Sequence, residues 1–100
     1  MEKGRPHRKL TLVKALIEAG RVMATASAFQ GARELGIDKL DGICAVVLSL
    51  TNQDFHKSMT TYADHRVWQD VYHARMPGFS GVYIKLTVMD DVLIVSFKEL

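Results

Sequence analysis

The feature that most constrains this chain is a change in the period of its hydrophobic residues near position 60. Up to about Met59, apolar residues recur three or four positions apart, which is typical of amphipathic helices. From about Tyr62 onward they alternate with polar residues, which is typical of strands with one buried face. Helices followed by strands within 100 residues predict a single α+β domain over residues 1–100. We expect the N-terminal helices to pack on one side of a C-terminal antiparallel β-sheet.

Three helices and one short edge strand are expected before residue 51. Each helix has an apolar face at helical spacing and a residue that suits its start or its end. The first helix is expected over Leu10–Ile17 and ends at Gly20, and the edge strand follows over Arg21–Ala24. The second helix is opened by a capping box at Ser27–Gln30 and closed by Gly36. The third is capped by Asp38 or Asp41 and carries an apolar face of Ile43, Val46, Val47 and Leu50. Cys44 lies inside this last, apolar helix, and we expect it in the core rather than as a reactive thiol.

The second half of the chain predicts a short helix and then an antiparallel sheet. The run Thr51–Asp54 is typical of a helix cap and is expected to open a short helix through Phe55 toward Met59. Strands are expected over 67–73, 82–89 and 92–99. The last two are joined by Asp90–Asp91, which predicts a hairpin with a two-residue turn.

The register of this hairpin places two polar side chains together. With a two-residue turn, Val88 faces Leu93, Leu86 faces Val95 and Ile84 faces Phe97, so these six apolar residues would form the core face. On the other face, Tyr83 would lie directly opposite Lys98, with Lys85 one step along the strand. A solvated cross-strand pair and a small polar site both fit this pairing when it is taken alone.

Further polar residues gather where helix is expected to change to sheet. His56 and Lys57 bring a titratable ring and a cation, and Gln69 brings an amide on the 67–73 strand. Lysine, tyrosine, glutamine and histidine together suit phosphate chemistry, because cations offset the charge that grows on phosphoryl oxygens and a titratable group moves protons.

Other function classes find weaker support. His56, His65 and His73 with Asp64 and Asp70 offer potential metal ligands, but none has the spacing of a helical metal motif. A Gly-x-Ser-x-Gly elbow and a phosphate-binding Gly-x-x-x-x-Gly-Lys loop are both absent.

Charge and hydropathy further restrict the possible partners and location of the protein. A net charge of +2 permits nucleic acid binding without arguing for it, and the basic N-terminus is a candidate for RNA or protein contacts. The longest apolar run, 43–48, is too short to span a membrane, and no apolar segment follows the basic start as in a secretory signal. We therefore expect a cytoplasmic protein with no membrane partner.

Two segments carry a family resemblance. The run Asp54–Tyr62, followed by Asp64-His65 and Trp68–Tyr72, closely resembles the MqsR family of bacterial toxins, and so does the ending Asp91–Glu99. The likeness also covers Met1–Lys3 with Pro6-His7, and Glu34–Gly36 with Asp41-Gly42, so it spans essentially the whole chain. The family has tyrosine where this sequence has His56, and its loop at Met76–Gly81 is about one residue shorter.

The resemblance implies a RelE-like fold and an mRNA interferase that cuts single-stranded mRNA at short sites beginning GC, without metal or other cofactor. It implies a cognate MqsA-like antitoxin with a zinc-binding domain and a helix-turn-helix domain, and contact with DNA only through that partner. The family's active-site residues fall on Lys57, Gln69, Tyr83 and Lys98. His56 and Lys85 are further candidates for RNA contact.

The expected function is therefore an endoribonuclease toxin of a type II toxin–antitoxin pair. The ribose 2′-OH would attack the neighbouring phosphate, with Lys57 and Lys98 stabilising charge, Gln69 positioning the RNA and Tyr83 moving a proton. Which group acts as base and which as acid stays open at this point. The alternative is a non-catalytic domain that binds nucleic acid or protein through the same polar face.

Overall fold

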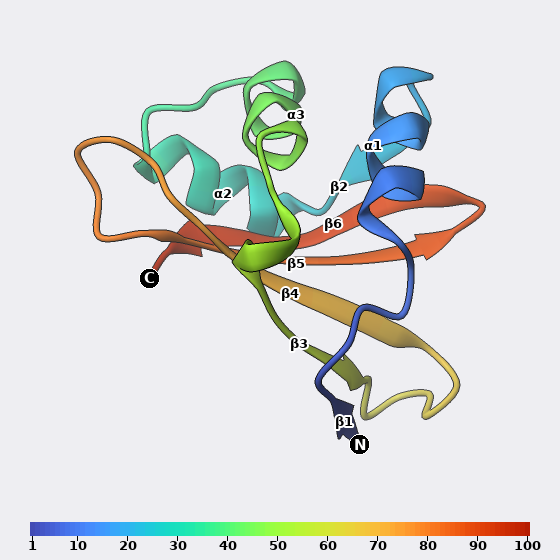
Figure 1. Cartoon of the computed structure of the whole chain (residues 1–100). Coiled ribbons are helices and arrows are strands. Elements are labelled where there is room, and N and C mark those ends of the chain that lie inside the picture. The colour runs from blue at the N-terminus through green and yellow to red at the C-terminus, as the bar shows by residue number, and fades with distance from the viewer.

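A six-stranded sheet carries three helices on one face, and the computed structural model describes all of residues 1–100 (Figure 1). The strand order is β1-β3-β4-β5-β6-β2, antiparallel throughout except for β2 and β6, which run parallel. The elements in chain order are β1 (Glu2–Lys3), α1 (Leu10–Glu18), β2 (Val22–Ala24), α2 (Ala26–Glu34), α3 (Leu40–Leu48), a 3₁₀ helix (Asn52–Asp54), β3 (Phe55–Thr60), β4 (Trp68–Ala74), β5 (Val82–Met89) and β6 (Asp91–Glu99). This confirms the predicted α+β class and the three predicted helices.

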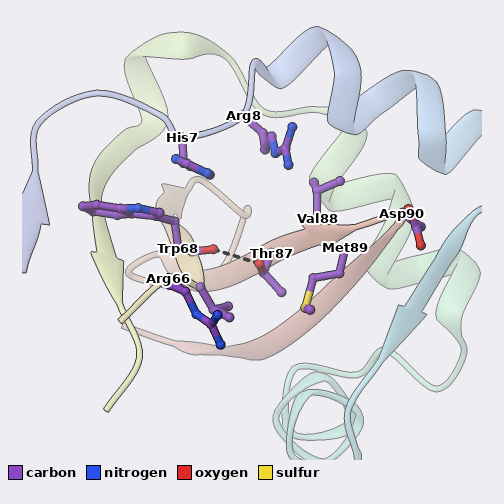
Figure 2. A pocket seen from close by; sticks show the side chains of 9 residues that line it. His7, Arg8, Arg66, Trp68, Thr87, Val88, Met89 and Asp90 are labelled. Atoms are coloured by element: carbon purple, nitrogen blue, oxygen red, sulfur yellow. Dashed lines mark hydrogen bonds between the residues drawn. The ribbon is translucent and has the colours of Figure 1, made fainter. Parts of the chain in front are cut away.

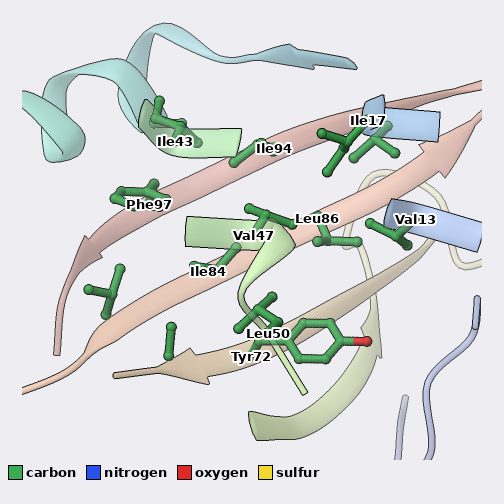
Figure 3. Close-up of a cluster of buried hydrophobic side chains, with 14 of the residues drawn as sticks. Val13, Ile17, Ile43, Val47, Leu50, Tyr72, Ile84, Leu86, Ile94 and Phe97 are labelled. Atoms are coloured by element: carbon green, nitrogen blue, oxygen red, sulfur yellow. The ribbon is translucent and has the colours of Figure 1, made fainter. Parts of the chain in front are cut away.

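The hydrophobic core lies between the helices and the sheet (Figure 3). Residues that the helical spacing placed on inner faces are buried there, among them Val13, Ile17, Ile43 and Val47. Cys44 is half-buried and packs against this core rather than lying inside it, and burial raises the pKa of its thiol. None of the helices has the length and hydrophobicity that a membrane crossing requires.

The caps of α2 and α3 differ from the prediction. The N-cap of α2 is Thr25 rather than Ser27: its hydroxyl accepts a hydrogen bond from the Ala28 amide at 3.1 Å. The reason is that β2 ends at Ala24, so the chain enters the helix at once. The N-cap of α3 is Lys39, with no side-chain hydrogen bond, so neither Asp38 nor Asp41 caps it. Gly20 and Gly36 follow α1 and α2 with positive φ, as expected for residues that end helices.

The segment after Thr51 begins as predicted and then departs from the prediction. Thr51 and Asp54 form a reciprocal capping box, but the helix it opens is a single 3₁₀ turn. From Phe55 the chain is extended, because it pairs with β4, so the predicted short helix toward Met59 is wrong. A bulge at His56 shifts the register, so that Phe55 lies opposite Tyr72 while Lys57 lies opposite Val71.

The predicted register of the β5–β6 hairpin is correct at the end far from the turn and wrong near the turn. Tyr83 pairs with Lys98, Ile84 with Phe97 and Lys85 with Ser96, as predicted. The turn, however, is formed around Asp90 alone, with φ 69°, and Met89 faces Asp91. Val95 is a bulged residue without a partner: Lys85 pairs with Ser96 on one side of it, and Leu86 pairs with Ile94 on the other. The one-residue shift that begins at the turn therefore ends at Val95. As a result, Val92 and Ile94 are buried, rather than the predicted Leu93 and Val95.

Helix α2 lies directly on β6, next to the end of the hairpin that carries Lys98. A Cβ atom at Gly31 would stand 1.9 Å from the carbonyl oxygen of Phe97, so only glycine allows this approach. On the same helix, the Thr25 hydroxyl donates to the Val95 carbonyl at 2.7 Å. Thr25 therefore joins the start of α2 to the bulge in β6.

The corrected cap leads to a test with a matched control. Thr25→Ala should lower the free energy of unfolding by about 1–2 kcal/mol, because it removes the α2 cap and the bond to the Val95 carbonyl. Ser27→Ala, on the exposed side of the same helix, should change it by less than about 0.5 kcal/mol. Urea unfolding measures both, and equal losses would contradict the assignment.

Candidate active site on the open face of the sheet

The face of the sheet away from the helices carries most of the polar side chains that the sequence singled out. Tyr72, Ile84 and Phe97 point toward the helices and are buried. Because neighbouring residues of a strand alternate in direction, the residues beside them point to the other side. We call this side the open face; its central members are Lys57, Gln69, Val71, His73, Tyr83, Lys85, Ser96 and Lys98.

One row of side chains crosses the open face over four neighbouring strands. Lys98 on β6 lies opposite Tyr83 on β5, and its Nζ atom is 5.2 Å from the centre of the phenol ring. Tyr83 lies opposite His73 on β4, with ring centres 6.0 Å apart. His73 stacks on His56 of β3, with ring centres 4.1 Å apart and planes 19° apart. We refer to His56, His73, Tyr83 and Lys98 as the aromatic row.

His73 is the member of this row that the sequence analysis did not select as a site residue. Burial lowers the pKa of His73 from its ordinary value, and the neighbouring His56 lowers it further. Alternation along the 67–73 strand already put His73 on the same side as Gln69. Its neighbours could not be found that way, because β4 and β5 are joined by a loop that carries no register signal.

The next row along the strands holds Lys57, Val71, Lys85 and Ser96. Val71 has no exposed surface although it lies outside the core cluster, which indicates that the stems of the lysines on either side cover it. The Lys57 ammonium is 3.0 Å from the Glu2 carboxylate, an ion pair open to solvent. A phosphate that binds Lys57 would compete with Glu2 for this ammonium group.

The structure separates Gln69 from the aromatic row. Gln69 lies opposite Met59, and it is four residues from His73 on the same strand, about 13 Å at the usual rise of a strand. All four predicted catalytic residues thus share the open face, one on each of four neighbouring strands. Only Tyr83 and Lys98 are in contact. Gln69 therefore lies well away from the Tyr83–Lys98 pair along the open face.

A cavity of about 400 Å³ lies elsewhere, where the N-terminal segment meets the β5–β6 turn (Figure 2). Its lining residues include His7, Arg8, Arg66, Trp68 and Asp90. His7 stacks on Trp68 at 5.6 Å, and burial, together with the nearby cations, lowers the pKa of His7. None of the predicted catalytic residues lines this cavity.

Asp70 holds the N-terminal segment in place beside this cavity. Its buried carboxylate accepts hydrogen bonds from the backbone amides of His7 and Arg8, at 2.9 and 3.1 Å, and from the Ser58 hydroxyl at 2.6 Å. This explains structurally the aspartate that follows Gln69 in the sequence. Asp70 points away from the open face and is not available for its chemistry.

The five residues weighed as metal ligands do not gather at one place, although His56 stacks on His73. Asp64 pairs with Arg66, which holds the pKa of that carboxyl below its usual value, and His65 is exposed. Nowhere in the chain do three or more His, Cys, Asp or Glu side chains form a group able to hold a metal ion.

The fold and the open face define a small α+β protein with lysines, stacked histidines and a tyrosine on one uncovered sheet surface. Residues 5–99 match the family model described as "Motility quorum-sensing regulator, toxin of MqsA". The chain therefore belongs to the MqsR toxin family, as its sequence motifs predicted. It is 56% identical over 99 residues to the mRNA interferase toxin MqsR of Escherichia coli (strain K12), and the match covers 99% of each chain.

The role of Asp70 can be tested separately from the open face. Asp70→Ala should lower the free energy of unfolding by about 2–4 kcal/mol, because three donors lose a charged acceptor. The freed N-terminal segment should also be cut faster by trypsin after Arg8. Asp38→Ala, at an exposed carboxylate, is the matched control and should leave both unchanged. A variant as stable as the wild type would contradict this role.

Proposed function

We propose that this chain is a toxin that acts as an endoribonuclease on single-stranded mRNA. In this proposal it cuts at short GC-containing sites without a metal ion, and so stops translation and growth. Family membership and the similarity to a protein named mRNA interferase toxin support it. The observation that carries it is the contact between Lys98 and Tyr83 on the open face, with Lys85 in the next row.

The chemistry follows from what each side chain offers to a phosphodiester. A phosphate placed over the Tyr83–Lys98 pair meets an ammonium group that offsets the charge developing in the transition state. The 2′-OH attacks phosphorus in line with the leaving 5′-oxygen, giving a 2′,3′-cyclic phosphate and a 5′-OH. In this proposal Tyr83 exchanges a proton with one of these oxygens.

The remaining residues are proposed to hold the RNA across the strands. Lys57 adds a second cation once the phosphate replaces Glu2, and Lys85 lies between it and the aromatic row. Gln69, further along β4, would position a neighbouring nucleotide. His56 is exposed, so its free side is a surface on which a base can stack.

The proposed partner is the antitoxin that the family description names, MqsA. We propose that the cognate antitoxin binds zinc, carries a helix-turn-helix domain and provides the complex's only contact with DNA. An mRNA substrate would place the activity in the cytoplasm.

Cleavage in a chelator tests the proposed function. Purified protein incubated with a GC-containing single-stranded RNA in EDTA should cut it and leave a cyclic phosphate, visible by gel and mass spectrometry. An RNA of the same length without GC should stay intact. Absence of cleavage, or cleavage only after metal is added, would overturn the proposal and favour a non-catalytic binding domain.

Substitutions test the residues. Lys98→Ala and Tyr83→Phe should each lower kcat/KM by about 10²-fold or more, because each removes a group that acts on the reacting phosphate. Lys57→Ala should lower it as well, and Lys39→Ala, on the helix side, is the control. Growth arrest after induction should follow the same order. Full toxicity of all three site variants would show that the site is wrongly assigned.

A further inference from the structure

We propose that His73 is the general base of the cleavage and Tyr83 the general acid. This inference rests on the proposed ribonuclease function and assigns the two proton-transfer roles within the aromatic row. It adds a catalytic residue to the four that the sequence motifs select.

The open face offers few groups able to accept a proton from a ribose hydroxyl. Lysine ammonium groups and the Gln69 amide are not proton acceptors in this sense. Asp70 points toward the helices, and Glu2 lies on β1, three strands away from Tyr83 on β5. This leaves the two stacked histidines, whose side chain is the one that changes charge near neutral pH.

His73 occupies the better position of the two. It lies between His56 and Tyr83, so a ribose next to a phosphate on the Tyr83–Lys98 pair falls over its ring. His56 is one position further from that phosphate and more exposed. His73 is therefore the histidine that a 2′-OH would meet first.

The surroundings keep His73 in its neutral, proton-accepting form. The groups around it are His56 and Lys57 from β3, Tyr83 and Lys85 from β5, and Arg75 just beyond its own strand. None of them is an anion at neutral pH, and two rings stacked at 4.1 Å disfavour a second positive charge. Burial and His56 accordingly lower the pKa of His73.

The proposed step balances in atoms and charge. A ring nitrogen of His73 takes the proton of the 2′-OH as O2′ forms its bond to phosphorus. The bond from phosphorus to O5′ breaks, and the Tyr83 hydroxyl gives its proton to that oxygen. The 2′,3′-cyclic phosphate leaves with the 5′-OH fragment, and exchange with water returns one proton from His73 and one to Tyr83.

The pH dependence of cleavage is the decisive measurement. In the wild type, kcat/KM should fall as the pH drops through the pKa of His73, and because that pKa is lowered, the fall should lie below pH 6.5. His73→Gln should lower kcat/KM by about 10²-fold and abolish this acidic fall. His65→Gln, at an exposed histidine outside the row, should leave rate and profile unchanged.

A second variant keeps the test informative if His73→Gln does not fold. His56→Phe retains a stacked ring but removes the imidazole that helps to lower the pKa of His73, so that pKa should rise and the acidic fall should move to higher pH. A folded His73→Gln with wild-type rate and profile overturns the inference, and so does an unmoved profile in His56→Phe. In either case a wild type that still cuts RNA leaves the proposed function standing, whereas a wild type that never cuts removes both.

Discussion

The pairing of β5 with β6, corrected by the bulge at Val95, is the interaction on which the rest of the structure depends. Without the extra residue, the shift that begins at Asp90 would run the length of the hairpin and move Tyr83 out of line with Lys98. The Thr25 hydroxyl holds the carbonyl of the bulged residue and caps α2 at the same time. One side chain thus ties the strand register to the position of a helix.

The same strands that build the core also display the candidate site. Alternate residues of β4 and β5 face the helices, as do Val92, Ile94 and Phe97 on either side of the bulge in β6, and the residues between them form the open face. His73 and Tyr83 therefore stand on the central strands β4 and β5, which pair with a strand on both sides, and His56 and Lys98 stand on the strands that flank them. Such a support is stiffer than a loop, which suits a site whose proposed chemistry depends on positioning.

The sequence predicted the parts of the molecule that local patterns control. Helical spacing and the glycines at 20 and 36 located the helices, and alternation located β4, β5 and β6. It failed at residues 55–59, where a genuine capping box opens only one turn before pairing with β4 takes over. For the site, the hairpin alone put Tyr83 opposite Lys98, whereas the place of His73 between His56 and Tyr83 depends on two further strand pairings.

The amino-acid sequence by itself determined the α+β class, the family and four candidate catalytic residues, because periodicity and motifs are properties of the chain. The tertiary structure decided which of those residues meet. The bulges at His56 and Val95 determine to which face of the sheet the residues next to them in β3 and β6 point. The order of the strands brings β3, β4, β5 and β6 side by side. The bulges and the strand order both depend on pairing between segments that are distant in the sequence, and the free energy of that pairing cannot be predicted from a local sequence pattern.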